Sequence, residues 1–173
     1  MVKIDSVLLL DTSASMLATD PGNRRMAAIR MFMSLLGDED RLAVMPFDAT
    51  ARLLSEFRLL HPLEKEKLGK LITEMGQPNG AFTNLHEPVD KALELLMKEK
   101  RPDALPLVIM LTDGRMDVGD VQMDKRLIDD LRDTIMPRYR QDHVRLFCLA
   151  FGDYDFPLLQ ALSNSTGGKA WSR

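Results

Sequence analysis

Nearly continuous apolar runs alternate along this chain with segments whose apolar residues recur at helical spacing. The clearest run covers residues 105–111 and reads Leu-Pro-Leu-Val-Ile-Met-Leu, and Val7 to Leu10 form another. A strand that is apolar on both sides must be covered on both faces, as in a parallel sheet between layers of helices. The alternation therefore predicts an α/β fold with a mainly parallel sheet.

Six strands and five helices are expected. The expected strands cover residues 6–10, 41–47, 51–57, 105–111, 144–151 and 169–172. The expected helices cover residues 26–36, 63–75, 84–98, 123–136 and 156–163. No linker, internal repeat or low-complexity tract divides the chain, so we expect a single domain.

The order of the strands follows from one short connection. Only residues 48–50 separate the second and third expected strands, a length that suits a hairpin, so the third strand should be an antiparallel edge strand. If these two strands lie on one side of the first strand, the next crossover leads to its other side. The prediction is a doubly wound sheet of order 3-2-1-4-5-6, with helices on both faces.

Composition excludes several classes of partner. The chain of 173 residues can bury a sizeable core, and its 23 basic and 26 acidic residues give a net charge of −3 without a Lys/Arg run. We therefore expect no nucleic-acid partner. No apolar stretch reaches the ~18 residues that span a bilayer, so we expect no direct membrane insertion. No signal-peptide pattern follows Met1. The compartment stays open between the cytoplasm and a domain excised from a larger secreted or surface protein.

Oxygen-bearing side chains are expected to meet at one rim of this sheet. They are Asp11, Ser13 and Ser15 after the first strand, Thr83 before the helix that leads into the fourth strand, and Asp113 after the fourth strand. In an open parallel sheet, ligands bind beyond the carboxyl ends of the strands, where the strand order reverses. That reversal falls between the first and fourth strands, so these five side chains should converge there.

This set of side chains favours a hard dication. Mg²⁺ prefers six oxygens and usually keeps waters, with one or two carboxylates from the protein. Two carboxylates would nearly neutralise the ion, and three neutral hydroxyls would leave it attractive to an incoming carboxylate. The set lacks imidazole and thiolate, which disfavours zinc and copper. Mg²⁺ is therefore the expected cofactor, with Mn²⁺ or Ca²⁺ as alternatives.

These elements closely resemble the von Willebrand factor A (VWA) family and its metal-ion-dependent adhesion site (MIDAS). The DxSxS element is Asp-Thr-Ser-Ala-Ser at 11–15, the threonine element is Thr-Asn-Leu at 83–85, and the third is Leu-Thr-Asp-Gly at 111–114. Residues 41–47 and the closing Thr-Gly-Gly-Lys at 166–169 add secondary resemblances. The elements stand in the family's order and cover nearly the whole chain.

The resemblance implies a Rossmann-like, non-catalytic domain that binds a protein through a divalent cation. In the family, Ser13, Ser15 and Thr83 would bind the metal directly or nearly so. Asp11 and Asp113 would act partly through water. The sixth coordination position would take a Glu or Asp carboxylate from the partner.

The sequence departs from the family pattern in two places. The family usually has glycine immediately before the threonine, whereas Ala81 and Phe82 stand between Gly80 and Thr83 here. Many members also continue into a helix after the sixth strand, whereas this chain stops at Arg173. We therefore expect residues 1–173 to be one VWA domain, excised from or part of a longer protein.

Other functions would use the same residues differently. A docking subunit of a chelatase or AAA-type assembly would use the same metal chemistry. A phosphohydrolase of the haloacid dehalogenase type would use Asp11 as nucleophile and Asp113 and Asp117 for Mg²⁺. However, Ser13 stands where that class has an acid–base aspartate, and a hydroxyl cannot do this work near neutral pH. Each element alone could also be an ordinary turn or helix cap.

Overall fold

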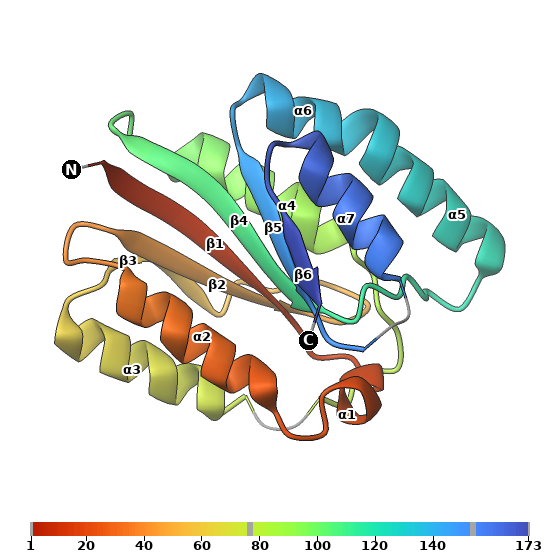
Figure 1. The fold of residues 1–173 in the computed structure, drawn as a ribbon, viewed down its shortest axis with the longest axis horizontal. Coiled ribbons are helices and arrows are strands. Elements are labelled where there is room, and N and C mark those ends of the chain that lie inside the picture. Colours follow the sequence, from red (N-terminus) through yellow and green to blue (C-terminus); the bar gives the residue numbers. More distant parts are fainter. Residues whose placement is uncertain (1, 76–77, 153–154, 173) are drawn as a thin grey trace.

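The computed structural model of this chain describes residues 2–75, 78–152 and 155–172, and within them it contains a six-stranded sheet with helices on both sides (Figure 1). The strands are β1 (Lys3–Asp11), β2 (Arg41–Phe47), β3 (Ser55–Leu59), β4 (Ala104–Thr112), β5 (Arg145–Ala150) and β6 (Ala170–Ser172).

The helices largely follow the predicted pattern. They are α1 (Ser15–Thr19), α2 (Arg24–Leu35), α3 (Pro62–Thr73), α4 (His86–Glu99), α5 (Val121–Asp130), α6 (Met136–Gln141) and α7 (Phe156–Ser165), and the π-helical turn η1 (Leu131–Ile135) joins α5 to α6. None of these helices is both long and apolar enough to cross a bilayer. The short α1 was not predicted.

The strand order is β3-β2-β1-β4-β5-β6, as predicted. Strands β1, β2, β4, β5 and β6 pair with one another in parallel, and only β3 pairs antiparallel, at the edge beside β2. The predicted doubly wound fold is confirmed, and the strand order reverses between β1 and β4.

The hairpin between β2 and β3 is present, but the predicted bounds of its second strand are wrong. The expected strand 51–57 begins only at Ser55. After β2 the chain makes a tight turn, in which the Asp48 N–H donates to the Thr50 carbonyl at 3.0 Å, and the pairing with β2 shifts register after Leu42. That shift lies inside β3, between Ser55 and Arg58. The residues after the turn bond to β2 outside the regular ladder, the Arg52 N–H to the Pro46 carbonyl at 3.1 Å and the Leu54 N–H to the Val44 carbonyl at 2.9 Å, so regular pairing starts later than the short link suggested.

The helix predicted over 123–136 continues to Gln141. The prediction ended it at Met136, directly before Pro137, and proline in a helix interior lacks the N–H that the helix needs. In the structure η1 directly precedes α6, and Pro137 occupies the first turn of α6. A proline is tolerated there, because the first turn has no use for its N–H.

Both faces of the central strands are buried. On β1, Val7 and Leu9 belong to the core shared with α4, η1, α6 and α7, and Leu8 and Leu10 belong to the core shared with α2 and α3. Figure 1 shows these two layers of helices on opposite sides of the sheet. This two-sided burial explains why β1 is an unbroken apolar run.

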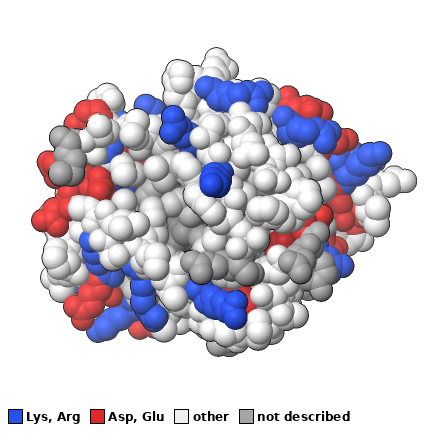
Figure 2. Space-filling model, viewed as in Figure 1, with Lys and Arg blue, Asp and Glu red and all other residues white. Residues whose placement is uncertain are grey.

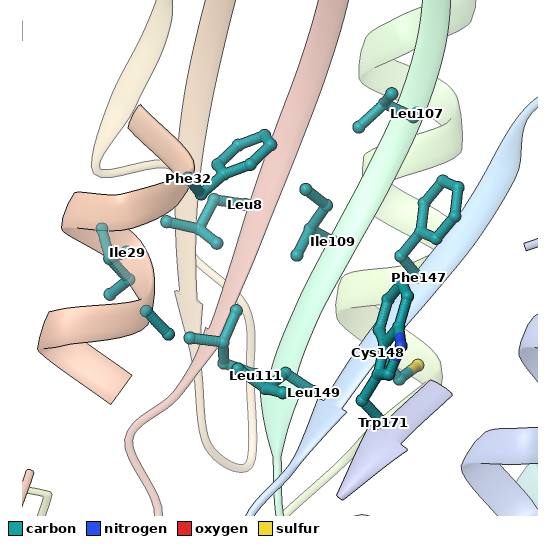
Figure 3. Close-up of a pocket in the computed structure, with 11 residues that line it drawn as sticks. Leu8, Ile29, Phe32, Leu107, Ile109, Leu111, Phe147, Cys148, Leu149 and Trp171 are labelled. Atoms are coloured by element: carbon teal, nitrogen blue, oxygen red, sulfur yellow. The ribbon is translucent and has the colours of Figure 1, made fainter. Parts of the chain in front are cut away.

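The α2 side of the sheet keeps an apolar groove over β4, β5 and β6 (Figure 3). Phe32 of α2 lies on one side of the groove, and Phe147 and Trp171 lie on the other, around a volume of about 320 Å³. The Trp171 ring stacks on Phe147 with ring centroids 6.2 Å apart and remains 46% exposed. In the view of Figure 2, uncharged residues cover most of the central surface, a few basic side chains stand among them, and most acidic residues lie towards the left and right margins.

Candidate metal centre

The loops after β1 and β4 and the loop before α4 meet around a small pocket at the carboxyl end of the sheet. Its volume is about 100 Å³, and its lining includes Ser13, Ser15 and Thr83. Arg115 and Asp117, from the loop after β4, also line it. The fold therefore brings Thr83 together with Ser13 and Ser15, which lie far from it along the chain.

Asp11 ends β1 and is fully buried. The Ser13 N–H and hydroxyl donate to its Oδ1 at 2.8 and 2.5 Å, and the Thr112 hydroxyl donates to its Oδ2 at 2.5 Å. Because Thr112 is the last residue of β4, this bond joins the two strands between which the order reverses. The Asp11 carboxylate is thus fixed by hydroxyl and N–H donors.

The pKa of Asp11 is raised from 3.8 to about 6. Burial is the largest cause, because it disfavours the charged carboxylate. The hydrogen bonds from Ser13 and Thr112 act in the opposite direction, and the nearby charge of Asp113 adds to the increase. These two carboxyl groups therefore lie close enough to repel each other.

The serine hydroxyls continue from this carboxylate towards the pocket. The Oγ atoms of Ser13 and Ser15 lie 3.0 Å apart, and Ser13 also bonds to Asp11. Ser15 begins α1, so the DxSxS element is the turn between the strand and this short helix. Its alternate residues form a row of oxygens that runs from the interior to the pocket wall.

Asp113 carries a buried oxygen without a hydrogen-bond partner. The residue is 1% exposed, and its Oδ1 accepts from the Arg115 N–H at 3.0 Å. Its Oδ2 is buried and accepts no hydrogen bond within the described part of the chain. Such an oxygen is costly to bury. A bound cation would offset that cost.

The side chains present fit a hard divalent cation. Over residues 2–75, 78–152 and 155–172, no group of three or more His, Cys, Asp or Glu side chains is placed to hold a metal ion. A metal site in this region must therefore use hydroxyl oxygens together with carboxylates. Neither Asp11 nor Asp113 is among the described residues that line the pocket, but Asp11 is joined to it through Ser13. The two carboxylates and the three hydroxyl residues are of the oxygen type that Mg²⁺ and Ca²⁺ prefer.

Backbone hydrogen bonds hold the loops of the pocket together. The N–H of Thr83 donates to the Asp117 carbonyl at 2.8 Å, and the N–H of Asp117 donates to the Thr83 carbonyl at 2.9 Å. The Ala14 N–H donates to the Gly80 carbonyl at 2.7 Å. A Cβ at Gly80 would lie 2.4 Å from the Cβ of Asp48, so this close approach requires glycine. The loop therefore presents Thr83 to the pocket although Ala81 and Phe82 follow the glycine.

Two residues that support the site were not predicted. Thr112 orients Asp11 from the neighbouring strand, and Arg25, 4% exposed, donates from Nη1 to the Asp11 carbonyl at 2.6 Å. A sequence pattern could have indicated each of these two residues. Arg25 shares a helical face with the buried Ile29 and Met33, and Thr112 is a hydroxyl residue at the end of an apolar strand.

The sequence matches the family model described as "von Willebrand factor type A domain" over residues 4–171. Inter-alpha-trypsin inhibitor heavy chain H2 of Sus scrofa is 26% identical over 170 residues, and the same protein of Mus musculus matches equally. The alignments cover 95% of this chain and 17% of those proteins, so the chain spans a small part of the length of these curated relatives.

Solved structures share the fold at low sequence identity. BatB from Bacteroides thetaiotaomicron superposes with a TM-score of 0.76 at 13% identity, covering 98% of this chain and 90% of that one. Proximal thread matrix protein 1 from the mussel byssus, solved with a zinc-occupied MIDAS motif, gives a TM-score of 0.71 at 18% identity. The superposition covers 99% of this chain and 44% of that one. Together with the family match over nearly its whole length, the fold places this chain in the von Willebrand factor type A domain family.

Proposed function

We propose that this VWA domain is a divalent-metal-dependent protein-binding module whose MIDAS consists of Asp11, Ser13, Ser15, Thr83 and Asp113. The observation that carries the proposal is the buried Oδ2 of Asp113, which accepts no hydrogen bond in the described structure and lies near the buried Asp11. Neither carboxylate forms a salt bridge with a described Lys, Arg or His. A bound cation would compensate both charges.

Each residue would contribute in its own way. Ser13, Ser15 and Thr83 line the pocket and offer neutral oxygens to the ion. Asp113 offers its unpaired Oδ2, and Asp11 is held in place through Ser13 and Thr112. When bound, Mg²⁺, or Mn²⁺ or Ca²⁺ in its place, would supply an electrophilic centre for a Glu or Asp carboxylate of a protein partner.

The arrangement of Asp11 argues against the phosphohydrolase alternative. A nucleophilic carboxylate must reach its substrate, but Asp11 is fully buried and both of its oxygens accept hydrogen bonds. It is also absent from the described lining of the pocket. We therefore propose binding without catalysis. A docking subunit of a chelatase or AAA-type assembly would use the same binding chemistry.

The proposal is tested with metal and a minimal acidic ligand. We expect acetyl-Gly-Glu-Gly-amide to bind the Mg²⁺-loaded protein, and acetyl-Gly-Gln-Gly-amide to bind much more weakly, in an NMR titration. EDTA, or Asp11→Ala combined with Ser13→Ala, should abolish binding of the glutamate peptide, with circular dichroism reporting an intact fold. The control is Ser34→Ala, on the exposed side of α2. Equal binding in EDTA, or by the double variant, would refute the proposal.

A further inference from the structure

Phe82 is an exposed aromatic residue at the edge of the proposed metal pocket. Its two neighbours in sequence, Ala81 and Thr83, both line the pocket, and Phe82 itself is 43% exposed. A single exposed apolar side chain is common on protein surfaces and needs no explanation by itself. The inference therefore depends on how this side chain is held and on what lies beside it.

The ring of Phe82 is fixed without being buried. A Cβ at Gly119 would lie 2.9 Å from the Cε1 of Phe82, so the ring lies directly against the backbone of this glycine. Gly119 has a φ of +87°, a conformation that favours glycine. The paired backbone bonds between Thr83 and Asp117, at 2.8 and 2.9 Å, hold the two loops in this arrangement. A partner would meet an aromatic side chain that is already positioned.

The surroundings of Phe82 combine cationic and hydroxyl groups. The pocket beside it is lined by the hydroxyl residues Ser13 and Thr83, and Arg115 lines it from the loop after β4. Preorganised aromatic residues are typical of the side chains that contribute most to binding energy in interfaces. A carboxylate entering the pocket would therefore bring its neighbouring residues towards an apolar surface.

We propose that Phe82 selects the partner of this domain: the captured segment carries an apolar side chain directly beside its Glu or Asp, and that side chain packs on the Phe82 ring. The inference rests on the proposed function, because the acidic residue must first be bound at the metal. It adds a class of partner, an acidic residue flanked by an apolar one.

Three blocked peptides test this selection. Acetyl-Gly-Glu-Gly-amide, acetyl-Leu-Glu-Gly-amide and acetyl-Gly-Glu-Leu-amide are titrated by NMR into the Mg²⁺-loaded protein. We expect one of the leucine peptides to bind about tenfold more tightly than the glycine peptide, as for a contact made by one buried apolar group. Phe82→Ala should remove this preference while the affinities for Mg²⁺ and for the glycine peptide stay unchanged. Leu105→Ala is the control, because Leu105 is 56% exposed near the amino end of β4, away from the pocket.

The outcomes separate the two proposals. Equal affinity of the wild-type protein for all three peptides would overturn the role of Phe82 and leave the metal-dependent function standing, as would a preference that persists in Phe82→Ala. This wild-type comparison does not depend on the folding of any variant. Failure of every glutamate peptide to bind in the presence of Mg²⁺ would overturn both proposals.

Discussion

Asp5 and Asp11 lie on the same strand and are both fully buried, but they have opposite surroundings. Asp5 forms salt bridges with Arg41 and Arg101, each at 2.9 Å. Burial alone would raise the pKa of Asp5, but the hydrogen bonds and charges of these arginines outweigh it and hold the pKa below its usual value. Asp11 has hydroxyl and N–H donors instead, and burial raises its pKa to about 6.

The difference distinguishes a carboxylate whose charge is paired within the protein from one that we propose as part of a metal site. The charge of Asp5 is compensated within the protein, at the end of the sheet where Arg41 begins β2 and Arg101 precedes β4. Asp11 and Asp113 lie at the carboxyl end, where no described basic side chain forms a salt bridge with them. Arg25 lies close enough to attract the Asp11 carboxylate, but its Nη1 donates to the backbone carbonyl of Asp11. The contrast with Asp5 therefore supports our proposal that a cation from outside the chain binds here.

The largest expected effect is the loss of stability on replacing Asp5. Asp5→Ala should lower the free energy of unfolding by about 3 kcal/mol, because it leaves two partly buried arginines without their carboxylate. Urea unfolding of the metal-free protein at pH 7 measures this. Asp11→Asn should cost much less or be stabilising under the same conditions, because it removes a buried charge that burial disfavours more than its hydrogen bonds and the nearby Arg25 favour it. Equal decreases in the free energy of unfolding of the two variants would contradict the proposed difference between Asp5 and Asp11.

The pH dependence of stability should also differ between the two residues. In EDTA, Asp11 binds its proton more tightly in the folded state than in the unfolded state, since its pKa rises from 3.8 to about 6. The free energy of unfolding should therefore fall as pH rises from below 4 to above 6, by roughly 3 kcal/mol in total from this residue. The contribution of Asp5 has the opposite sign, because its lowered pKa gives stability above 3.8 that is lost as pH falls through the folded value.

Urea unfolding from pH 4 to pH 8 in EDTA tests these signs. The decrease in the free energy of unfolding above pH 4 should be absent in Asp11→Asn. In the wild-type protein, saturating Mg²⁺ should turn this decrease into an increase. A fall of the same size in Asp11→Asn would assign the effect to another group.

The affinity for Mg²⁺ should depend more on Asp113 than on Asp117, a second aspartate in the same loop. Asp113→Asn removes the charge of the unpaired oxygen and should weaken Mg²⁺ binding about 100-fold, or about 2.7 kcal/mol, in isothermal titration calorimetry. Asp117→Asn is the matched control, because Asp117 lines the pocket but is not among the proposed ligands. An equal or larger loss in Asp117→Asn would require a different set of ligands.

The smallest expected effect is the loss of Mg²⁺ affinity when Thr112 of β4 no longer forms its hydrogen bond to Asp11. Thr112→Val keeps the shape of the side chain but removes the hydroxyl that donates to Oδ2 of Asp11 and accepts from the Gly114 N–H at 3.1 Å. Loss of such a supporting hydrogen bond should weaken Mg²⁺ binding about tenfold and leave the fold intact. Thr73→Val, at an exposed position of α3, is the control for calorimetry. Unchanged affinity in Thr112→Val would show that this bond does not orient the carboxylate.

The sheet order could be predicted because it depends on features that are local in sequence. The apolar runs define the strands, and one short connection after β2 requires an antiparallel edge. The exact start of β3 could not be predicted, because the residues between the turn and Ser55 bond to β2 outside the regular ladder, an arrangement that depends on tertiary packing. The continuation past Pro137 was missed for a similar reason, since the preceding π-helical turn leaves no clear pattern in the sequence.

The candidate site was predicted less completely than the fold. The convergence of Ser13, Ser15 and Thr83 on one pocket follows from topology. The buried face of α2 contains Arg25, but its bond to the Asp11 carbonyl depends on tertiary packing. The unpaired Oδ2 of Asp113 depends on the positions of all surrounding donors, so no pattern of residues reveals it.

Anomalous diffraction from crystals grown with MnCl₂ tests the central claim most directly. We predict one strong manganese peak in the pocket, coordinated by oxygens of the set Asp11, Ser13, Ser15, Thr83 and Asp113, and its loss in crystals of Asp113→Asn. A well-ordered pocket without a manganese peak at saturating metal, or a peak held by other residues, would contradict the account.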